Sequence, residues 1–221
     1  MKRNGRYKYQ IGFTLVELLV AMTILALVAI LSWRGLDQIV RARDAVTLSM
    51  ANERALAQFF DQVGIDVRQA ALDLDLGQPA IAFGAGQLQI VRQLNVSGQA
   101  PRLQVVRYQV PQGRVLRLAS PPLATFGQLR AALAVEAGME GWSTVELING
   151  VRAVSVRAWV RQRGWTANMQ DVQAAFNKNL SQLTALQARQ IPPERSMTGI
   201  ELTAHIVKAQ HPLTRILLVG E

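Results

Sequence analysis

Hydrophobic residues run almost without interruption from Phe13 to Trp33, and Glu17 is the only ionisable residue among them. An α-helix needs about 20 apolar residues to cross a bilayer, so this segment predicts a membrane-spanning helix. A carboxylate inside such a helix is costly, which favours a functional role for Glu17. The alternative is a carboxylate near the helix end that reaches the lipid headgroups.

Beyond Trp33 the pattern becomes that of an amphipathic helix. No proline interrupts residues 13–75, and Gly77 and Pro79 are typical of a helix end. We therefore expect one helix to continue to residue 76, with its apolar face in the core of a domain. The apolar face holds Leu56, Phe60, Val63, Val67, Ala70 and Leu74, and the polar positions hold Arg54, Gln58, Asp61, Gln62, Asp66 and Gln69.

After Pro79 the period of the apolar residues shortens to two, which indicates β-strands with one solvent-exposed face. Asn149-Gly150 is a tight-turn signal, so segment 143–149 is expected to pair across it with the next strand. A short helix near 129–135 and a glutamine-rich amphipathic helix within 170–190 complete the pattern, and the latter insertion is a candidate partner surface. The predicted fold is α+β, a long amino-terminal helix packed on antiparallel sheet. Strands are predicted at 87–93, 103–110, 114–119, 154–161, 200–206 and 213–219, the second and third joined as a hairpin across Pro111-Gln112-Gly113.

The charge distribution predicts how the chain is oriented in the membrane. The chain has a net charge of +9, and four of its basic residues precede Gly12 with no acidic residue among them. A basic stretch before an apolar helix marks the side that stays in the cytoplasm, so the bulk of the chain is expected outside. An ordinary secretory signal has a shorter apolar core with its cleavage site after it, whereas here the small residue Gly12 precedes the run. The basic leader residues are Lys2, Arg3, Arg6 and Lys8.

Few residues suggest catalysis or a cofactor. The chain has no cysteine, and its two histidines, His205 and His211, fall on a strand's polar face and in a turn, where we expect solvated side chains. No nucleophile–base, zinc or phosphate-binding motif occurs, so we expect neither an enzyme nor a cofactor. Asp73 and Asp75 are the best local candidates for calcium, but nothing nearby completes a cage, so no metal is expected and the pair is interpreted as helix-end solvation.

Basic strand residues interleaved with tryptophan raise the possibility of nucleic-acid binding. Arginine on an exposed strand face is common, however, and protects sheet edges from aggregation. No nucleic acid is therefore expected as a partner. The residues concerned are Arg107, Arg117, Arg157, Arg161 and Arg163, with Trp159 and Trp165.

The sequence Gly12-Phe13-Thr14-Leu15-Val16-Glu17, after a basic leader and before an apolar helix, resembles the class III signal of type IV pilins and type II secretion pseudopilins. The resemblance implies that a prepilin peptidase cuts between Gly12 and Phe13 and methylates the new amine of Phe13. It also implies that Glu17 pairs with the amino-terminal amine of a neighbouring subunit, which fits the need of a buried charge for a partner.

Later motifs are similar to those of J-type minor pseudopilins of type II secretion systems. That resemblance implies a non-catalytic subunit of the pseudopilus tip complex, which primes pseudopilus assembly. It implies I-type and K-type minor pseudopilins as direct partners, and also the major pseudopilin, the peptidase and the bacterial inner membrane. The motifs are Trp33-Arg34-Gly35-Leu36, Arg41-Ala42-Arg43-Asp44, Val67-Arg68-Gln69-Ala70, 105–110 with 113–117, and 147–151.

The expected organisation is therefore a leader at 1–12, a single membrane helix at 13–34, its periplasmic continuation at 35–76 and a β-rich periplasmic domain at 77–221. The alternative function is a minor pilin of a type IV pilus, for adhesion, motility or DNA uptake. A third class of function is a membrane-anchored enzyme or DNA-binding module that shares only the membrane anchor with these families.

Overall fold

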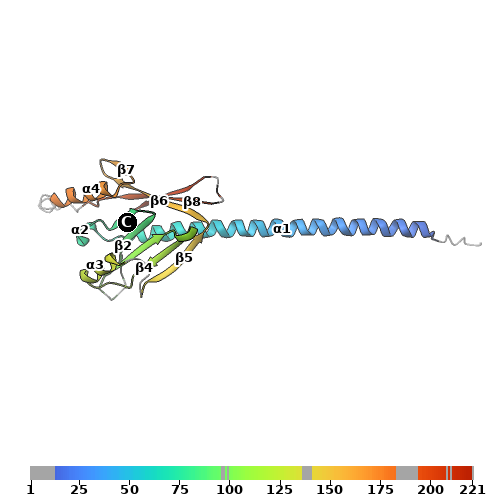
Figure 1. The fold of residues 1–221 in the computed structure, drawn as a ribbon, viewed down its shortest axis with the longest axis horizontal. Helices are drawn as coiled ribbons and strands as arrows, with labels where there is room; N and C mark the ends of the chain where they lie inside the picture. The colour runs from blue at the N-terminus through green and yellow to red at the C-terminus, as the bar shows by residue number, and fades with distance from the viewer. Residues whose placement is uncertain are drawn as a thin grey trace, which may run out of the picture. The chain divides into compact units, whose positions relative to one another are not determined.

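The computed structural model describes residues 13–95, 98, 100–135, 141–182, 194–207, 209 and 211–220. The chain forms two compact units that divide between Ala51 and Asn52. Helix α1, Leu15–Arg68, contributes residues to both units (Figure 1).

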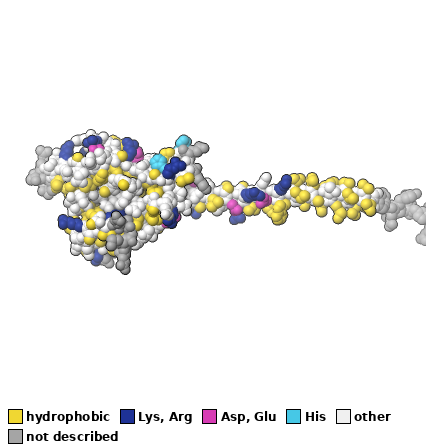
Figure 2. All heavy atoms as spheres, in the orientation of Figure 1, with side chains coloured by type: hydrophobic (Ala, Val, Ile, Leu, Met, Phe, Trp, Pro, Cys, Tyr) yellow, Lys and Arg dark blue, Asp and Glu magenta, His cyan; other side chains and the backbone are white. Residues whose placement is uncertain are grey.

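The first unit consists of α1 up to Ala51. Its described side chains are exposed, apart from the half-buried Asp37, which forms an ion pair with Arg41 one turn later. Hydrophobic side chains cover the first part of this segment, where Glu17 is the one charged residue of the sequence, and further charged residues follow from Arg34 onward (Figure 2). The predicted apolar helix is confirmed, and it is long and apolar enough to cross a membrane.

The end of α1 differs from the prediction of an unbroken helix to residue 76. The helix stops at Arg68, and a separate short helix, α2, covers Asp73–Leu76. Between them the backbone pairs with a strand instead: the Ala71 amide donates to the carbonyl of Val91 at 2.9 Å, and the Gln93 amide donates to the carbonyl of Gln69 at 2.8 Å. These sheet-like bonds replace the helical ones, which is why the helix ends early.

Sheet A contains five antiparallel strands in chain order, and its middle follows the sequence prediction closely. Strands β3 and β4 form the expected hairpin across the 3₁₀ turn η1, Pro111–Gly113. One face of this sheet meets α1, and α3, Phe126–Ala134, packs against β3. The strands are β1 (Ile81–Gly84), β2 (Gln87–Leu94), β3 (Arg102–Gln109), β4 (Arg114–Ala119) and β5 (Ser143–Asn149).

Sheet B has the strand order β7-β6-β8-β9, and the chain enters it at Gly150. The predicted hairpin across Asn149-Gly150 is wrong, because β5 pairs with β4 in sheet A while β6 pairs with β8 in sheet B. The φ angle of Gly150 is 73°, which lets the backbone turn from one sheet to the other. Helix α4, Met169–Ser181, covers part of the predicted 170–190 insertion, whose residues 183–190 lie outside the described part. The strands are β6 (Val151–Val160), β7 (Gly164–Thr166), β8 (Gly199–Ile206) and β9 (Leu213–Leu218).

The core of the second unit forms around the last four turns of α1. Its apolar face contacts residues of both sheets, and Figure 1 shows this part of α1 between β2 and β4 on one side and β6 and β8 on the other. The predicted α+β arrangement of a long helix packed on antiparallel sheet is therefore confirmed, with two sheets. The core includes Phe59, Phe60, Val63 and Val67 of α1, Ile90, Val106 and Ala119 of sheet A, and Ala158, Ile200 and Leu202 of sheet B.

Candidate functional site

The first turn of α1 is closed by Thr14 and Glu17. The carboxylate oxygen Oε2 of Glu17 accepts bonds from the Thr14 amide at 3.0 Å and the Thr14 hydroxyl at 2.9 Å. The Glu17 amide donates to the Thr14 hydroxyl oxygen at 3.2 Å. This reciprocal pattern is a capping box, which satisfies backbone groups that the start of a helix leaves without partners. Glu17 is therefore held at the helix start by its own chain.

The surroundings of Glu17 are apolar and open. The neighbouring side chains of Leu15, Val16, Leu18 and Leu19 are all exposed. The other residues in the apolar window of α1 are likewise not buried by the chain itself. Phe13 is likewise exposed, and Gly12 lies outside the described residues. An exposed apolar surface of this length requires lipid or other helices around it, and the proposed cleavage and pairing roles of Gly12, Phe13 and Glu17 stay predictions.

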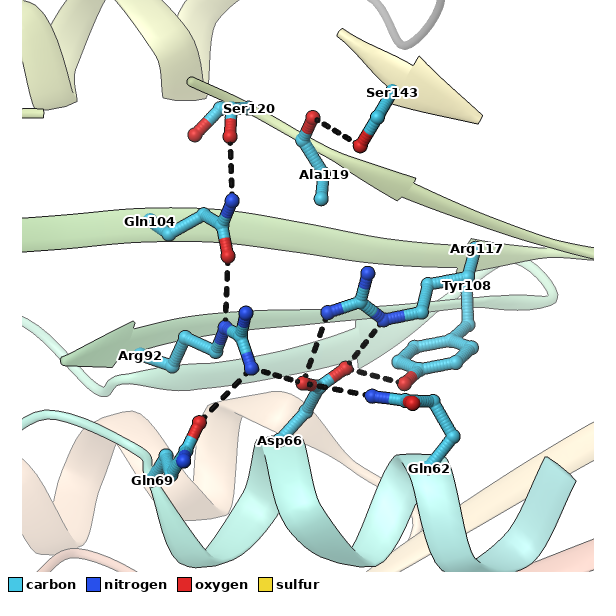
Figure 3. Close-up of polar contacts among 10 residues, drawn as sticks. All are labelled: Gln62, Asp66, Gln69, Arg92, Gln104, Tyr108, Arg117, Ala119, Ser120 and Ser143. Atoms are coloured by element: carbon cyan, nitrogen blue, oxygen red, sulfur yellow. Dashed lines mark hydrogen bonds and ion pairs between the residues drawn. The ribbon is translucent and has the colours of Figure 1, made fainter. Parts of the chain in front are cut away.

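A second polar site lies inside the globular unit, around Asp66 of α1. The Asp66 side chain is fully buried and faces three strands of sheet A, whose side chains converge on its carboxylate (Figure 3). Arg117 of β4 donates from Nε to Oδ2 at 2.8 Å and from Nη2 to Oδ1 at 3.0 Å. Arg92 of β2 donates to Oδ1 at 2.8 Å, and the Tyr108 hydroxyl of β3 donates to Oδ2 at 2.5 Å. The helix is thus tied to three adjacent strands through one carboxylate.

Further amide side chains surround this site. Gln69, one turn after Asp66, accepts from Arg92 at 2.9 Å, and Gln104 accepts from the same guanidinium at 2.8 Å. Gln104 in turn donates to the backbone carbonyl of Ser120 at 2.7 Å (Figure 3). A buried ion pair is stable only when its remaining donors and acceptors are satisfied in this way.

The electrostatics follow from this burial. Burial raises the pKa of Tyr108 well above its ordinary value, and the Asp66 charge and hydrogen bond raise it further. Burial lowers the pKa of Arg92, although Asp66 opposes the shift. For Arg117 burial also acts downward, but the hydrogen bond and charge of Asp66 outweigh it and raise the pKa. Both arginines stay charged and Tyr108 stays neutral, so the site is a fixed structural anchor.

The sequence prediction placed Asp66 at a polar position outside the apolar stripe of α1, but its side chain is fully buried. It also considered Arg107 and Arg117 as exposed cations for a nucleic acid, but Arg107 is buried and the Arg117 side chain is only 12% exposed. Arg107 donates to three backbone carbonyls at the end of α3 and lies 5.0 Å from the ring centroid of Trp142. One signal was available in the sequence: Asp66 directly precedes Val67 of the apolar stripe, and Arg92 and Arg117 each lie two positions after an apolar core residue of their strand.

The interpretation of Asp73 as helix-end solvation is also wrong. The carboxylate is buried, and Oδ1 accepts from the Ala80 amide at 2.8 Å. Its Oδ2 accepts from the Ser196 amide at 2.7 Å and the Ser196 hydroxyl at 2.5 Å. Asp73 therefore joins the segment after α1 to a distant part of the chain, whereas Asp75 is exposed. Among the described residues no cluster of three or more His, Cys, Asp or Glu side chains could hold a metal ion.

The space between the sheets offers little room for a small molecule. The cavity lined by Phe59, Val63, Tyr108, Val115 and Leu202 has a volume of about 10 Å³. That volume is close to the minimum for a single water molecule. The described interior is therefore packed for stability.

The comparison with known families points to the amino terminus. Residues 7–33 match the family described as the prokaryotic N-terminal methylation motif. The comparison with curated proteins gives no match. Pilin-like proteins with this motif are generally structural rather than enzymatic. The chain therefore carries a type IV pilin-like signal followed by an apolar helix suited to a single-pass membrane anchor.

Proposed function

We propose that this protein is a minor pseudopilin of the J type in a type II protein secretion system. It joins I-type and K-type minor pseudopilins in the tip complex that primes assembly of the pseudopilus on the major pseudopilin. It is not an enzyme. It spans the bacterial inner membrane once, with its amino terminus in the cytoplasm and its globular unit in the periplasm.

The observation that carries the proposal is Glu17, one carboxylate on a helix whose apolar window is otherwise uncharged and exposed. In a membrane such a charge favours a partner of opposite sign. The amine of Phe13, freed when a prepilin peptidase cuts after Gly12, is such a charge on a neighbouring subunit. The choice of a J-type pseudopilin rests on the later motifs, which are weaker.

The capping geometry allows the charge of Glu17 to be tested apart from its role in the helix. In the Glu17→Gln variant the amide oxygen can still accept from Thr14, but the side chain carries no charge. Thr23→Ala is a matched control, since the Thr23 hydroxyl bonds only to the Leu19 carbonyl of its own helix.

The experiment co-expresses the full chain with I-type and K-type pseudopilins and recovers complexes in mild detergent. We expect Glu17→Gln to insert normally but to lose most partner recovery, while Thr23→Ala keeps it. Equal recovery from Glu17→Gln and the parent chain would count against the assembly role. Recovery with minor pilins of a type IV pilus, and not with pseudopilins, would favour the alternative function.

A further inference from the structure

Strand β9 is a regular outer strand of sheet B in the part of the chain that the structure describes. Among the described strands, β9 pairs only with β8, and the six pairs from Leu213 to Leu218 show no register shift. The Ile216 side chain is 61% exposed, that of Leu218 51% and that of Leu213 42%. An edge of this kind presents backbone amides and carbonyls to another chain.

Other sheet edges in the described part of the chain carry features that oppose pairing. Helix α4 packs against β1, and β7 has only three residues. The pairing of β5 with β4 shifts register between Val115 and Leu116 of β4. Strand β5 also carries Glu146, which forms an ion pair with Arg114 at 3.5 Å. Bulges, short strands, charges and covering helices are the usual means of blocking edge pairing. Strand β9 has a proline only before its first residue.

The outer face of sheet B has an apolar row that ends at this edge. Trp165, Trp159, Gly199 and Leu218 lie in register across the four strands. The two tryptophan rings are in edge contact, with centroids 5.4 Å apart, and Trp159 is 42% exposed. The alternate side chains of an added strand would continue this row beside Ile216 and Leu218, so apolar residues fit there.

The inner face of β9 favours a particular charge on any strand that adds to this edge. Arg215 points toward α1, donates to Asp61 Oδ1 at 2.8 Å and lies 5.3 Å from the ring centroid of Phe60. A strand added to β9 would partly cover this guanidinium, which has further donors. Asp61 occupies only part of that donor set, so an acidic side chain of the added strand would pair with the remaining donors, whereas a basic side chain would be repelled.

The sequence extends this argument beyond Arg215. Residues 13–150 carry 11 basic and 11 acidic residues, whereas residues 151–221, which contain all of sheet B, carry 9 basic and 4 acidic residues. The excess of basic over acidic residues beyond the leader therefore lies in the last third of the sequence, which contains β9. A positively charged surface attracts and orients an acidic partner.

We propose that β9 is a docking edge for an extended segment of a partner protein, which adds to sheet B as a further strand. The segment has apolar residues on the side of Ile216 and Leu218 and acidic residues on the side of Arg215. This mode of recognition uses main-chain bonds for affinity and alternate side chains for specificity. The proposal does not depend on whether the assembly is a pseudopilus or a pilus.

The test uses the full chain in a non-ionic detergent and two labelled synthetic peptides. One peptide alternates valine with glutamate, and the other has lysine in place of glutamate. Fluorescence anisotropy measures binding, and hydrogen exchange with mass spectrometry locates the protected amides. Ile216→Asn removes the exposed apolar side chain from β9 without changing the charge. Val145→Asn makes the same kind of change on the exposed position of β5, and circular dichroism verifies that both variants are folded.

We expect the glutamate peptide to bind and to protect amides in 213–218, with affinity that falls as salt is raised. Ile216→Asn should weaken binding by about tenfold or more, the effect of losing one well-packed apolar contact, while Val145→Asn binds like the parent chain. The proposal is overturned by absent binding, by equal binding of the lysine peptide, by equal loss in Val145→Asn, or by protection elsewhere. It is also overturned if light scattering shows a dimer that Ile216→Asn abolishes without peptide, because the occupant is then a second copy.

Discussion

Asp66 and Arg117, 51 positions apart in the sequence, form a two-point ion pair inside the globular unit, with contacts of 2.8 and 3.0 Å. The planar guanidinium matches both oxygens of the carboxylate, so the pair fixes orientation as well as distance. It sets the rotation of α1 about its axis against sheet A, because only one helix position faces β4 in this way. Apolar packing of Val63 and Val67 alone would constrain that rotation less tightly.

Replacing Asp66 by asparagine is expected to lower the free energy of unfolding by about 3–5 kcal/mol, since Arg92 and Arg117 would remain largely buried without a counter-charge. Urea denaturation followed by tryptophan fluorescence measures the change. Asp61→Asn is the control, because its ion pair with Arg215 is exposed and should contribute less than about 1 kcal/mol. Equal losses in the two variants would refute the anchoring role of Asp66.

Tyr108 gives a spectroscopic test of the same site. It is the only tyrosine after Gly12, so in the chain beginning at Phe13 the absorbance of tyrosinate reports on it alone. Its pKa is raised on folding, so the protonated form is favoured in the folded state. The resulting stability is fully present below the unfolded pKa near 10 and is lost as pH rises toward the folded pKa.

The free energy of unfolding should therefore fall above pH 10, by at most about 1.4 kcal/mol per pH unit from this group. No tyrosinate should appear in the folded protein until it unfolds. In Tyr108→Phe the contribution of this residue to the alkaline slope disappears. A normal tyrosine titration near pH 10 in the folded chain would contradict the burial and the bond to Asp66.

Asp73 is expected to hold the segment after α1 to the irregular segment that directly precedes β8. Asp73→Ala leaves the buried amides of Ala80 and Ser196 without their acceptor, which should cost about 2–4 kcal/mol. Hydrogen exchange should increase at Ser196 in particular. Asp75→Ala, at an exposed position of the same helix, should change stability by less than about 0.5 kcal/mol. Unchanged exchange at Ser196 in Asp73→Ala would show that this contact is not needed.

Periodicity predicted the regular elements well because they depend on local patterns. The period of two located β2, β3, β4, β6, β8 and β9, and the apolar stripe of α1 identified its buried face. It missed β1 and β7, which are too short to show a period. It could not show that Gly150 joins two sheets rather than one hairpin, because strand pairing is decided by long-range packing.

The polar interior was the harder part to predict. Asp66, Asp73 and Arg107 look like surface residues in sequence, since charged side chains are seldom fully buried. Each is buried because its partners come from distant segments, and a single sequence does not show such pairing. Glu17 differs, because its anomaly is local: one charge in an apolar run is visible without a structure.

The most direct test of the pilin-like account is the mass of the amino terminus. The full chain, co-expressed with a prepilin peptidase, should yield a membrane protein that begins at Phe13 and carries one methyl group on its amine. Gly12→Leu should keep the leader, with the rest of the chain unchanged. A membrane protein that retains residues 1–12 despite an active peptidase, or one cleaved after Trp33, would contradict the account.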